Sequence, residues 1–250
     1  MIACRRTALV LATAAALSFW AGPAAAEPAL RCRAFAAEAA LSARPREAAS
    51  AVRSFERIKA AVRAEPHQVL FLGDSLTERF DPLVWREHMA PRAVLNAGVS
   101  GDRSENLLWR LEHGNLDGPP PAGIVVLIGT NDLTYAGGRS PELAAEGIRA
   151  NLLYLRRRLP DAGILLLGLL PRGGSPDGEL RQKTVRVNEL IRHCGDSGAV
   201  VYQDVGRVLL DTEGRLPPEI APDRLHLSQL GYTGLVQRLD PLIDSLLDHR

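Results

Sequence analysis

The chain has 250 residues, of which 46% are hydrophobic and 24% are charged, and its formal net charge is +1. This length and composition are typical of a globular protein that forms one large domain with a substantial core. A net charge this close to zero gives no electrostatic basis for binding nucleic acid or an anionic membrane surface, so we expect neither as a partner.

The first 26 residues have the pattern of a secretory signal peptide. Arg5 and Arg6 precede an apolar run over residues 8–20, and three consecutive alanines come just before Glu27. The run is short for a bilayer span, and an uncleaved anchor is the alternative. We therefore predict a signal peptide at 1–26 and a secreted or periplasmic protein without stable membrane insertion after cleavage.

Cleavage would remove Cys4 and leave two cysteines, Cys32 and Cys194. An even pair in an oxidising compartment allows a disulfide but does not require one. Because the sequence does not show whether the geometry suits a bridge, the pairing stays open on the sequence alone.

Residues 27–66 read as a helical extension that precedes the main domain. The stretch 34–64 is rich in Ala, Glu and Arg, which predicts one helix, a break near Pro45, and a second helix over 48–63. Apolar residues recur at helical spacing in the second helix, which indicates a packing face. We find no residues in this extension that suggest chemistry.

From residue 67 to residue 250, short apolar runs alternate with helical patterns. The runs predict buried strands at 69–72, 93–97, 124–128, 164–170 and 199–203. Helices are expected at 76–89, 103–113, 141–159, 179–193 and 228–247, with Ser228 as the N-cap of the last one. Continuous apolar strands that alternate with helices predict an α/β domain with a five-stranded parallel sheet covered on both faces.

Turn-forming and polar residues follow the first three strands and precede the last helix. The four motifs are Gly73-Asp74-Ser75-Leu76, Gly98-Val99-Ser100-Gly101-Asp102, Gly129-Thr130-Asn131-Asp132 and Asp223-Arg224-Leu225-His226. Each motif by itself is compatible with an ordinary turn. Because open α/β sheets bind ligands at the carboxyl ends of their strands, the repeated placement predicts a site at that edge.

The motifs contain the residue types of nucleophilic catalysis. A serine hydroxyl such as that of Ser75 needs a base to take its proton. His226 is suited to this role because histidine titrates near neutral pH. Asp223, three residues earlier, can reach one ring nitrogen while the other nitrogen points to Ser75. The remaining histidines and the two cysteines do not show metal-ligand spacing, so we expect no metal.

Acyl transfer also needs donors for the negative charge that develops on the carbonyl oxygen. The backbone amides of Ser75 and Gly101 and the side-chain amide of Asn131 are the candidates, with plain turns and a helix cap as their alternative roles. The pair Gly98 and Gly101 lacks the lysine of a P-loop and the full dinucleotide fingerprint, which disfavours a phosphate-binding role.

Taken in order, the four motifs resemble those of the GDSL or SGNH hydrolases. The likeness extends from about residue 69 to residue 246 and includes stretches similar to platelet-activating-factor acetylhydrolase Ib catalytic subunits and their bacterial relatives, at 107–111, 169–173, 180–183 and 187–188. The resemblance implies a flavodoxin-like three-layer α/β/α sandwich without metal or organic cofactor. It also implies that Ser75 is the nucleophile, His226 the base and Asp223 the acid, with Ser75, Gly101 and Asn131 as the oxyanion hole.

These observations predict a serine ester hydrolase that removes short, acetyl-like groups through an acyl-enzyme on Ser75. Its substrate would be a small-molecule, glycan or lipid ester. The alternatives are a lysophospholipase or thioesterase of the same fold, and a non-catalytic glycan-binding module. Arg103, Trp109 and Arg172 are explained equally well by packing and surface charge, and we do not assign them to the site. The oligomeric state stays open.

Overall fold

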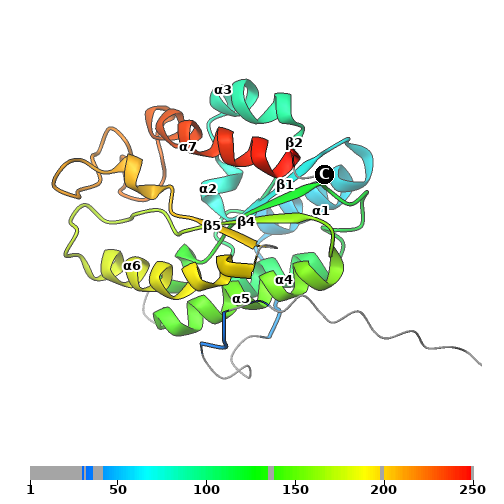
Figure 1. The fold of residues 1–250 in the computed structure, drawn as a ribbon, viewed down its shortest axis with the longest axis horizontal. Coiled ribbons are helices and arrows are strands. Elements are labelled where there is room, and N and C mark those ends of the chain that lie inside the picture. Colours follow the sequence, from blue (N-terminus) through cyan, green and yellow to red (C-terminus); the bar gives the residue numbers. More distant parts are fainter. Residues whose placement is uncertain (1–29, 31, 36–41, 135–137, 198–199, 249–250) are drawn as a thin grey trace, which may run out of the picture.

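The computed structural model describes residues 30, 32–35, 42–134, 138–197 and 200–248 (Figure 1). The predicted signal peptide lies outside the described residues.

Five strands form one sheet: β1 (Val69–Gly73), β2 (Val94–Gly98), β3 (Gly123–Leu127), β4 (Gly163–Leu167) and β5 (Val200–Gln203). The helices are α1 (Ala49–Ala64), α2 (Ser75–Glu78), α3 (Pro82–Val84), α4 (Ser104–Glu112), α5 (Pro141–Arg158), α6 (Glu179–Ile191) and α7 (Gln229–Asp248). Short π or 3₁₀ turns are η2 (Trp85–Met89), η3 (Ala90–Arg92), η4 (Thr130–Leu133), η5 (Arg192–Ser197) and η6 (Gly206–Leu209).

All strand pairs are parallel, and the strand order is β2-β1-β3-β4-β5. This is the flavodoxin-like order, in which the chain changes direction across the sheet between β1 and β3. The predicted α/β fold with a five-stranded parallel sheet is therefore confirmed. In register, Gly73 at the end of β1 lies opposite Gly98 of β2 and Leu127 of β3.

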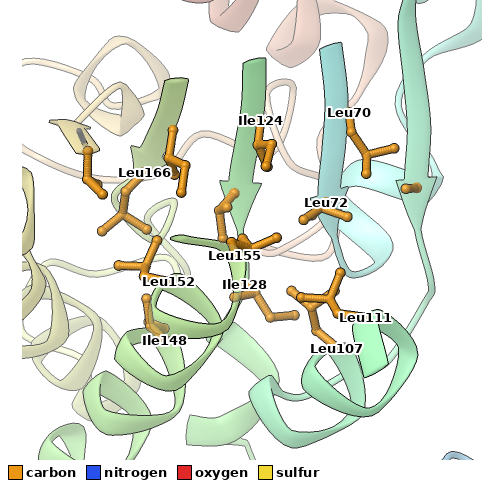
Figure 2. Packing of buried hydrophobic residues seen from close by; sticks show 14 of the residues in the cluster. Leu70, Leu72, Leu107, Leu111, Ile124, Ile128, Ile148, Leu152, Leu155 and Leu166 are labelled. Carbon is orange, nitrogen blue, oxygen red and sulfur yellow. The ribbon is translucent and has the colours of Figure 1, made fainter. Parts of the chain in front are cut away.

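Alternating side chains of the strands divide the core into two layers. On one face, strand residues such as Leu70, Leu72 and Ile124 pack against α1, α4, α5 and α6. Figure 2 shows the contribution of α4 and α5 to this layer, including Leu107 and Leu152. On the other face, the intervening strand residues pack against α7 and the turns around α3, as Figure 1 shows above the sheet. Burial on both faces explains why the strands are continuous apolar runs.

The single helix predicted at 76–89 is wrong, because the chain is interrupted between α2 and α3. Asp81 precedes Pro82, and a residue before proline is disfavoured in the α conformation. Asp81 has φ −53° and ψ 125°, and its carboxylate accepts hydrogen bonds from the amides of Leu83 and Val84. The segment therefore ends one helix and caps the next.

In the N-terminal extension, the second predicted helix is confirmed as α1, but the first is not found among the described residues. Residues 32–35 and 42–48 are not helical, and residues 36–41 lie outside the described part. Pro45 disfavours a helical conformation at Arg44, and the backbone of Arg44 bonds instead to α4. Its amide donates to the Glu105 carbonyl at 3.2 Å, and its carbonyl accepts from the Asn106 side chain at 3.0 Å.

Cys32 and Cys194 form a disulfide with their Cα atoms 4.5 Å apart. The bond joins the N-terminal segment to η5, which follows α6 and precedes β5. The pairing left open by the sequence is therefore present. Among the helices of the described residues, none combines the length and the apolar character needed to cross a membrane.

Candidate active site

Ser75 lies where β1 turns into α2, at the carboxyl edge of the sheet. It is the first residue of α2, and its side chain is largely buried. The preceding residue, Asp74, caps the helix by accepting a hydrogen bond from the Leu76 amide at 2.9 Å. Because β1 lies between β2 and β3, this turn is at the point where the strand order reverses, the usual ligand position in such sheets.

The structure brings together the three side chains predicted as nucleophile, base and acid. Ser75 Oγ lies 2.9 Å from His226 Nε2, although the two residues are 151 positions apart in the chain. His226 Nδ1 lies 2.7 Å from Asp223 Oδ2. A carboxylate oxygen can only accept, so Nδ1 carries the proton and Nε2 is left to accept from the serine hydroxyl.

The loop before α7 is held in shape by the same aspartate. Asp223 Oδ1 accepts from the amide of Leu225 at 3.0 Å and from the amide of His226 at 2.7 Å. Ser228 then accepts from the Gly231 amide at 3.2 Å, which makes it the N-cap of α7, as predicted. The aspartate thus fixes both the backbone and the ring of the histidine.

The start of α7 is tied to α2, which fixes the distance between His226 and Ser75. Tyr232 is buried, and its hydroxyl donates to the Leu76 carbonyl at 2.9 Å. Its ring centroid lies 4.2 Å from that of Phe80. This hydrogen bond and ring contact hold the helix after the histidine against the helix that begins with the serine.

Asp223 is ionised at neutral pH although it is part of the site. Its side chain is 56% exposed, against 30% for His226. The partial burial of Asp223 acts to raise the pKa of its carboxyl group, but hydrogen bonds from the His226 ring and from the amides of His226 and Leu225 outweigh burial and lower the pKa. A negative charge is therefore available to stabilise a protonated His226.

The residues predicted as oxyanion donors follow the ends of three adjacent strands. Gly101 follows β2 and has φ +80°, a conformation that favours glycine. Asn131 lies in η4 after β3, and its side-chain amide donates to the carbonyl of Asp102 at 2.9 Å. This contact places Asn131 against the loop that carries Gly101, while the Val99 amide donates to the Gly73 carbonyl at 3.1 Å and joins that loop to β1. Their role as oxyanion donors stays a prediction.

Three other conspicuous residues have contacts that support the fold. The Arg172 guanidinium is buried and donates to the Thr130 carbonyl and the Thr134 hydroxyl, both at 2.9 Å. Trp109 stacks on His113, with ring centroids 4.2 Å apart. Arg103 is the N-cap residue of α4.

Sequence reasoning missed three buried aspartates that hold the site loops in place: Asp74, Asp102 and Asp132. Asp102 accepts from Arg110 Nε at 2.7 Å. Asp132 accepts from the Ser104 hydroxyl at 2.6 Å and from Arg139 at 2.7 Å. The signal that could have found them is the recurrence of an aspartate in each of the first three motifs.

Among these aspartates, Asp74 has the most perturbed environment. The pKa of its carboxyl group is raised to about 7, chiefly by burial and less by the negative charges of Asp102 and Asp132, while the hydrogen bond from the Leu76 amide and the charge of Arg172 act to lower it. Asp74 is therefore close to half protonated at neutral pH, which distinguishes it from the ionised Asp223.

Within the described part of the chain, no three His, Cys, Asp or Glu side chains come together as a metal site. Asp102 and Asp132 are paired with arginines. The chemistry that this arrangement can perform by itself is proton transfer between a serine hydroxyl and a histidine, with amide donors nearby.

Comparisons with known proteins agree with this arrangement. The sequence profile of the GDSL-like Lipase/Acylhydrolase family matches residues 71–233. The chain is 37% identical over 182 residues to platelet-activating factor acetylhydrolase IB subunit alpha1 of Bos taurus, which covers 72% of this chain and 76% of the bovine one.

Two solved structures share the fold at lower identity. A GDSL-like lipase from Bacteroides thetaiotaomicron is 21% identical with a TM-score of 0.64, and the match covers 77% of this chain and 97% of that one. An acetylxylan esterase from Geobacillus stearothermophilus is 19% identical with a TM-score of 0.58, covering 73% of this chain and 95% of the other.

Proposed function

Because the chain belongs to the GDSL-like lipase/acylhydrolase family and is therefore an esterase, we propose that it hydrolyses short-chain acyl esters through an acyl-enzyme on Ser75. The observation that carries the proposal is the continuous chain of hydrogen bonds from Ser75 through His226 to Asp223. A packing role does not explain why a serine, a histidine and an aspartate from opposite ends of the domain meet in this order.

In the first half of the reaction, the Ser75 oxygen attacks the ester carbonyl while His226 Nε2 takes the hydroxyl proton. Asp223 stabilises the imidazolium that forms. The negative charge on the substrate oxygen is met by the amides of Ser75, Gly101 and Asn131. The tetrahedral intermediate then collapses, the ester C–O bond breaks, and the alcohol leaves with the proton from His226.

In the second half, water replaces the alcohol. His226 takes a proton from the water molecule, whose oxygen attacks the acyl carbon, and the same amides meet the second oxyanion. Collapse of this intermediate breaks the bond to Ser75, returns the proton to the serine oxygen and releases the carboxylic acid. Each step uses side chains and backbone amides of the chain together with water.

The preference for a short acyl group is supported by the similarity of the chain to an acetylhydrolase. The bovine relative, with 37% identity over most of this chain, is an acetylhydrolase by name. The acetylxylan esterase from Geobacillus shares the fold. Because that enzyme is named for a glycan ester, we test acetylated glycans as a substrate class beside lipid esters. A secreted or periplasmic location is part of the proposal, supported by the leader-like N-terminus and by the disulfide.

The experiment compares wild type with Ser75→Ala on p-nitrophenyl esters of two, four and eight carbons, on acetylated sugars and on a lysophospholipid. We expect the highest kcat/KM for the acetyl ester and a loss of several orders of magnitude in Ser75→Ala. A fluorophosphonate should label wild type at Ser75 and leave Ser75→Ala unlabelled. Ser140→Ala, an exposed serine at the start of α5, is the matched control and should keep activity and labelling.

Undiminished turnover by Ser75→Ala would exclude the acyl-enzyme. Preference for the eight-carbon ester or the lysophospholipid would favour the lysophospholipase alternative. Glycan binding without turnover and without labelling would favour the binding module.

A further inference from the structure

We propose that Arg46 is a positioning residue for the oxyanion hole, because it holds the peptide group between Ser100 and Gly101 in the orientation that the reaction needs. Arg46 precedes α1 and lies outside the region that matches the family profile, which begins at residue 71. The inference rests on the proposed function, since it assigns a supporting group to the predicted Gly101 donor.

The carbonyl of Ser100 is the group that Arg46 contacts in the loop after β2. Arg46 Nη1 donates a hydrogen bond to this oxygen at 3.0 Å. The Ser100 carbonyl and the Gly101 N–H belong to one planar peptide group, and no cis peptide bonds occur in the described residues. In a trans peptide the two groups point in opposite directions, so a guanidinium that fixes the carbonyl also fixes the direction of the Gly101 N–H.

The contact also strengthens the donor. A charged donor on the carbonyl oxygen makes a stronger hydrogen bond than a neutral one, and it polarises the peptide so that its N–H carries more positive charge. The Gly101 amide therefore gains from Arg46 at the moment when negative charge develops on the substrate oxygen.

The remaining polar groups of Ser100 are held by the last residue of α2 and the residue that follows it. Its amide donates to Glu78 Oε2 at 2.8 Å, and its hydroxyl accepts from Arg79 Nε at 3.2 Å. Burial acts to raise the pKa of the Glu78 carboxyl group, but hydrogen bonds from Ser100 and Ser54 outweigh it and lower the pKa, so Glu78 is an ionised acceptor at neutral pH. Arg46, from the N-terminal extension, binds the third polar group of Ser100, its carbonyl oxygen.

Gly101 itself leaves the space in which the guanidinium lies. A Cβ atom built on Gly101 would come within 2.1 Å of Arg46 Nη1 and within 3.0 Å of Arg46 Cζ. The guanidinium thus packs directly on the glycine backbone. The absence of a side chain at position 101 allows both the positive φ and this close approach.

The backbone that carries Arg46 is fastened independently of the site. Arg44, two residues earlier, bonds through its amide to the Glu105 carbonyl and through its carbonyl to the Asn106 side chain, both on α4. α1 begins three residues after Arg46 and packs on the core. The backbone at Arg46 is therefore held in place on both sides, and its side chain extends from there to the loop that contains Ser100 and Gly101.

The experiment measures kcat and KM of Arg46→Ala and Arg46→Lys on p-nitrophenyl acetate, with Arg44→Ala as the control for an exposed arginine of the same segment. We expect kcat of Arg46→Ala to fall about tenfold to hundredfold, less than the loss of an oxyanion donor itself, with KM changed less than about twofold. Arg46→Lys should recover part of kcat because it keeps the charge without the planar guanidinium. Arg44→Ala should match wild type.

A second readout separates positioning from general stabilisation of the fold. A boronic acid forms a tetrahedral anionic adduct with an active serine, so its affinity should fall in parallel with kcat in Arg46→Ala. Thermal unfolding checks that each variant is folded, and Arg46→Lys carries the test if Arg46→Ala does not fold.

Equal kcat and boronate affinity in Arg46→Ala and Arg44→Ala would overturn the inference, and so would an effect confined to KM. Ser75→Ala is measured in the same series. If Ser75→Ala stays active, the proposed function fails; if it is inactive while Arg46→Ala behaves as Arg44→Ala, only the role of Arg46 fails.

Discussion

His226 Nδ1 lies 2.7 Å from Asp223 Oδ2, and elsewhere in the molecule His88 Nδ1 lies the same 2.7 Å from Asp240 Oδ2. The second pair joins η2 to α7, and its side chains are 27% and 24% exposed, so its histidine is about as exposed as His226 and its aspartate is more buried than Asp223. The contact between histidine and aspartate therefore does not by itself define the site. What distinguishes His226 is Ser75 Oγ, 2.9 Å from its other ring nitrogen.

The first prediction compares these two pairs. Asp223→Asn removes the charge that stabilises a protonated His226, and we expect kcat to fall about a hundredfold or more. Because Asp223 is more than half exposed, water replaces part of its effect, and the loss should be smaller than that of Ser75→Ala.

Asp240→Asn is the matched control, and it disturbs a contact of the same length that lacks the serine. It should lower the melting temperature and leave kcat unchanged. Equal kcat losses in the two variants would contradict the assignment of Asp223.

The second prediction concerns the amide of Asn131. Asn131→Ala removes a proposed oxyanion donor, and we expect kcat to fall about 10²–10³-fold with little change in KM. It also leaves the Asp102 carbonyl without this hydrogen bond, which should cost about 1 kcal/mol of unfolding free energy.

Asn131→Asp provides the comparison, because it keeps the size of the side chain but replaces a donor by a negative charge. Its kcat should be at least as low as that of Asn131→Ala. Activity retained by Asn131→Asp would show that position 131 does not donate to the substrate.

Much of the fold could be predicted from local patterns. The strands are continuous apolar runs because both faces of the sheet are buried, and the turns after β1, β2 and β3 carry the polar residues that mark the site. The spatial meeting of Ser75 and His226 follows from the same topology, since it brings strand ends and the loop before α7 to one edge.

The parts that could not be predicted depend on contacts between distant segments. Pro45 predicts a break within residues 42–48, but nothing local indicates that the backbone of Arg44 bonds to α4. Arg46 meets Ser100 across 54 positions of sequence, and no local pattern indicates that contact. The break at Asp81, by contrast, could have been predicted from Pro82, but the apolar residues at helical spacing over 76–89 favoured one continuous helix.

The third prediction concerns the disulfide. Cys32 and Cys194 are 162 positions apart, so their bond restricts a large part of the unfolded chain. We expect reduction, or the double change Cys32→Ser and Cys194→Ser, to lower the unfolding free energy by about 2–4 kcal/mol. Cys194 lies in η5, which precedes β5, so the bond is away from the carboxyl edge of the sheet and kcat at 25 °C should not change.

Chemical denaturation with and without dithiothreitol measures this effect. Wild type should shift to a lower midpoint on reduction, whereas the double serine variant should give one midpoint in both conditions. An unchanged wild-type midpoint would contradict a stabilising bond.

The last prediction follows from the buried carboxyl group of Asp74. Its pKa in the folded protein is raised from 3.8 to about 7, chiefly by burial and further by the charges of Asp102 and Asp132. The folded state therefore binds a proton that the unfolded state has released between these pH values, so the contribution of Asp74 to stability is fully present below about pH 4 and is lost as the pH rises through 7. Asp74→Asn removes this titration, and its side-chain oxygen can still accept from the Leu76 amide. Denaturation midpoints of Asp74→Asn should therefore agree with those of wild type more closely at pH 5 than at pH 8.5, where Asp74→Asn should be the more stable protein.

Asp161→Asn, which changes an exposed aspartate beyond the end of α5, serves as the control and should follow wild type at both pH values. Parallel behaviour of Asp74→Asn and wild type from pH 5 to pH 8.5 would show that Asp74 is ionised in the folded protein throughout this range.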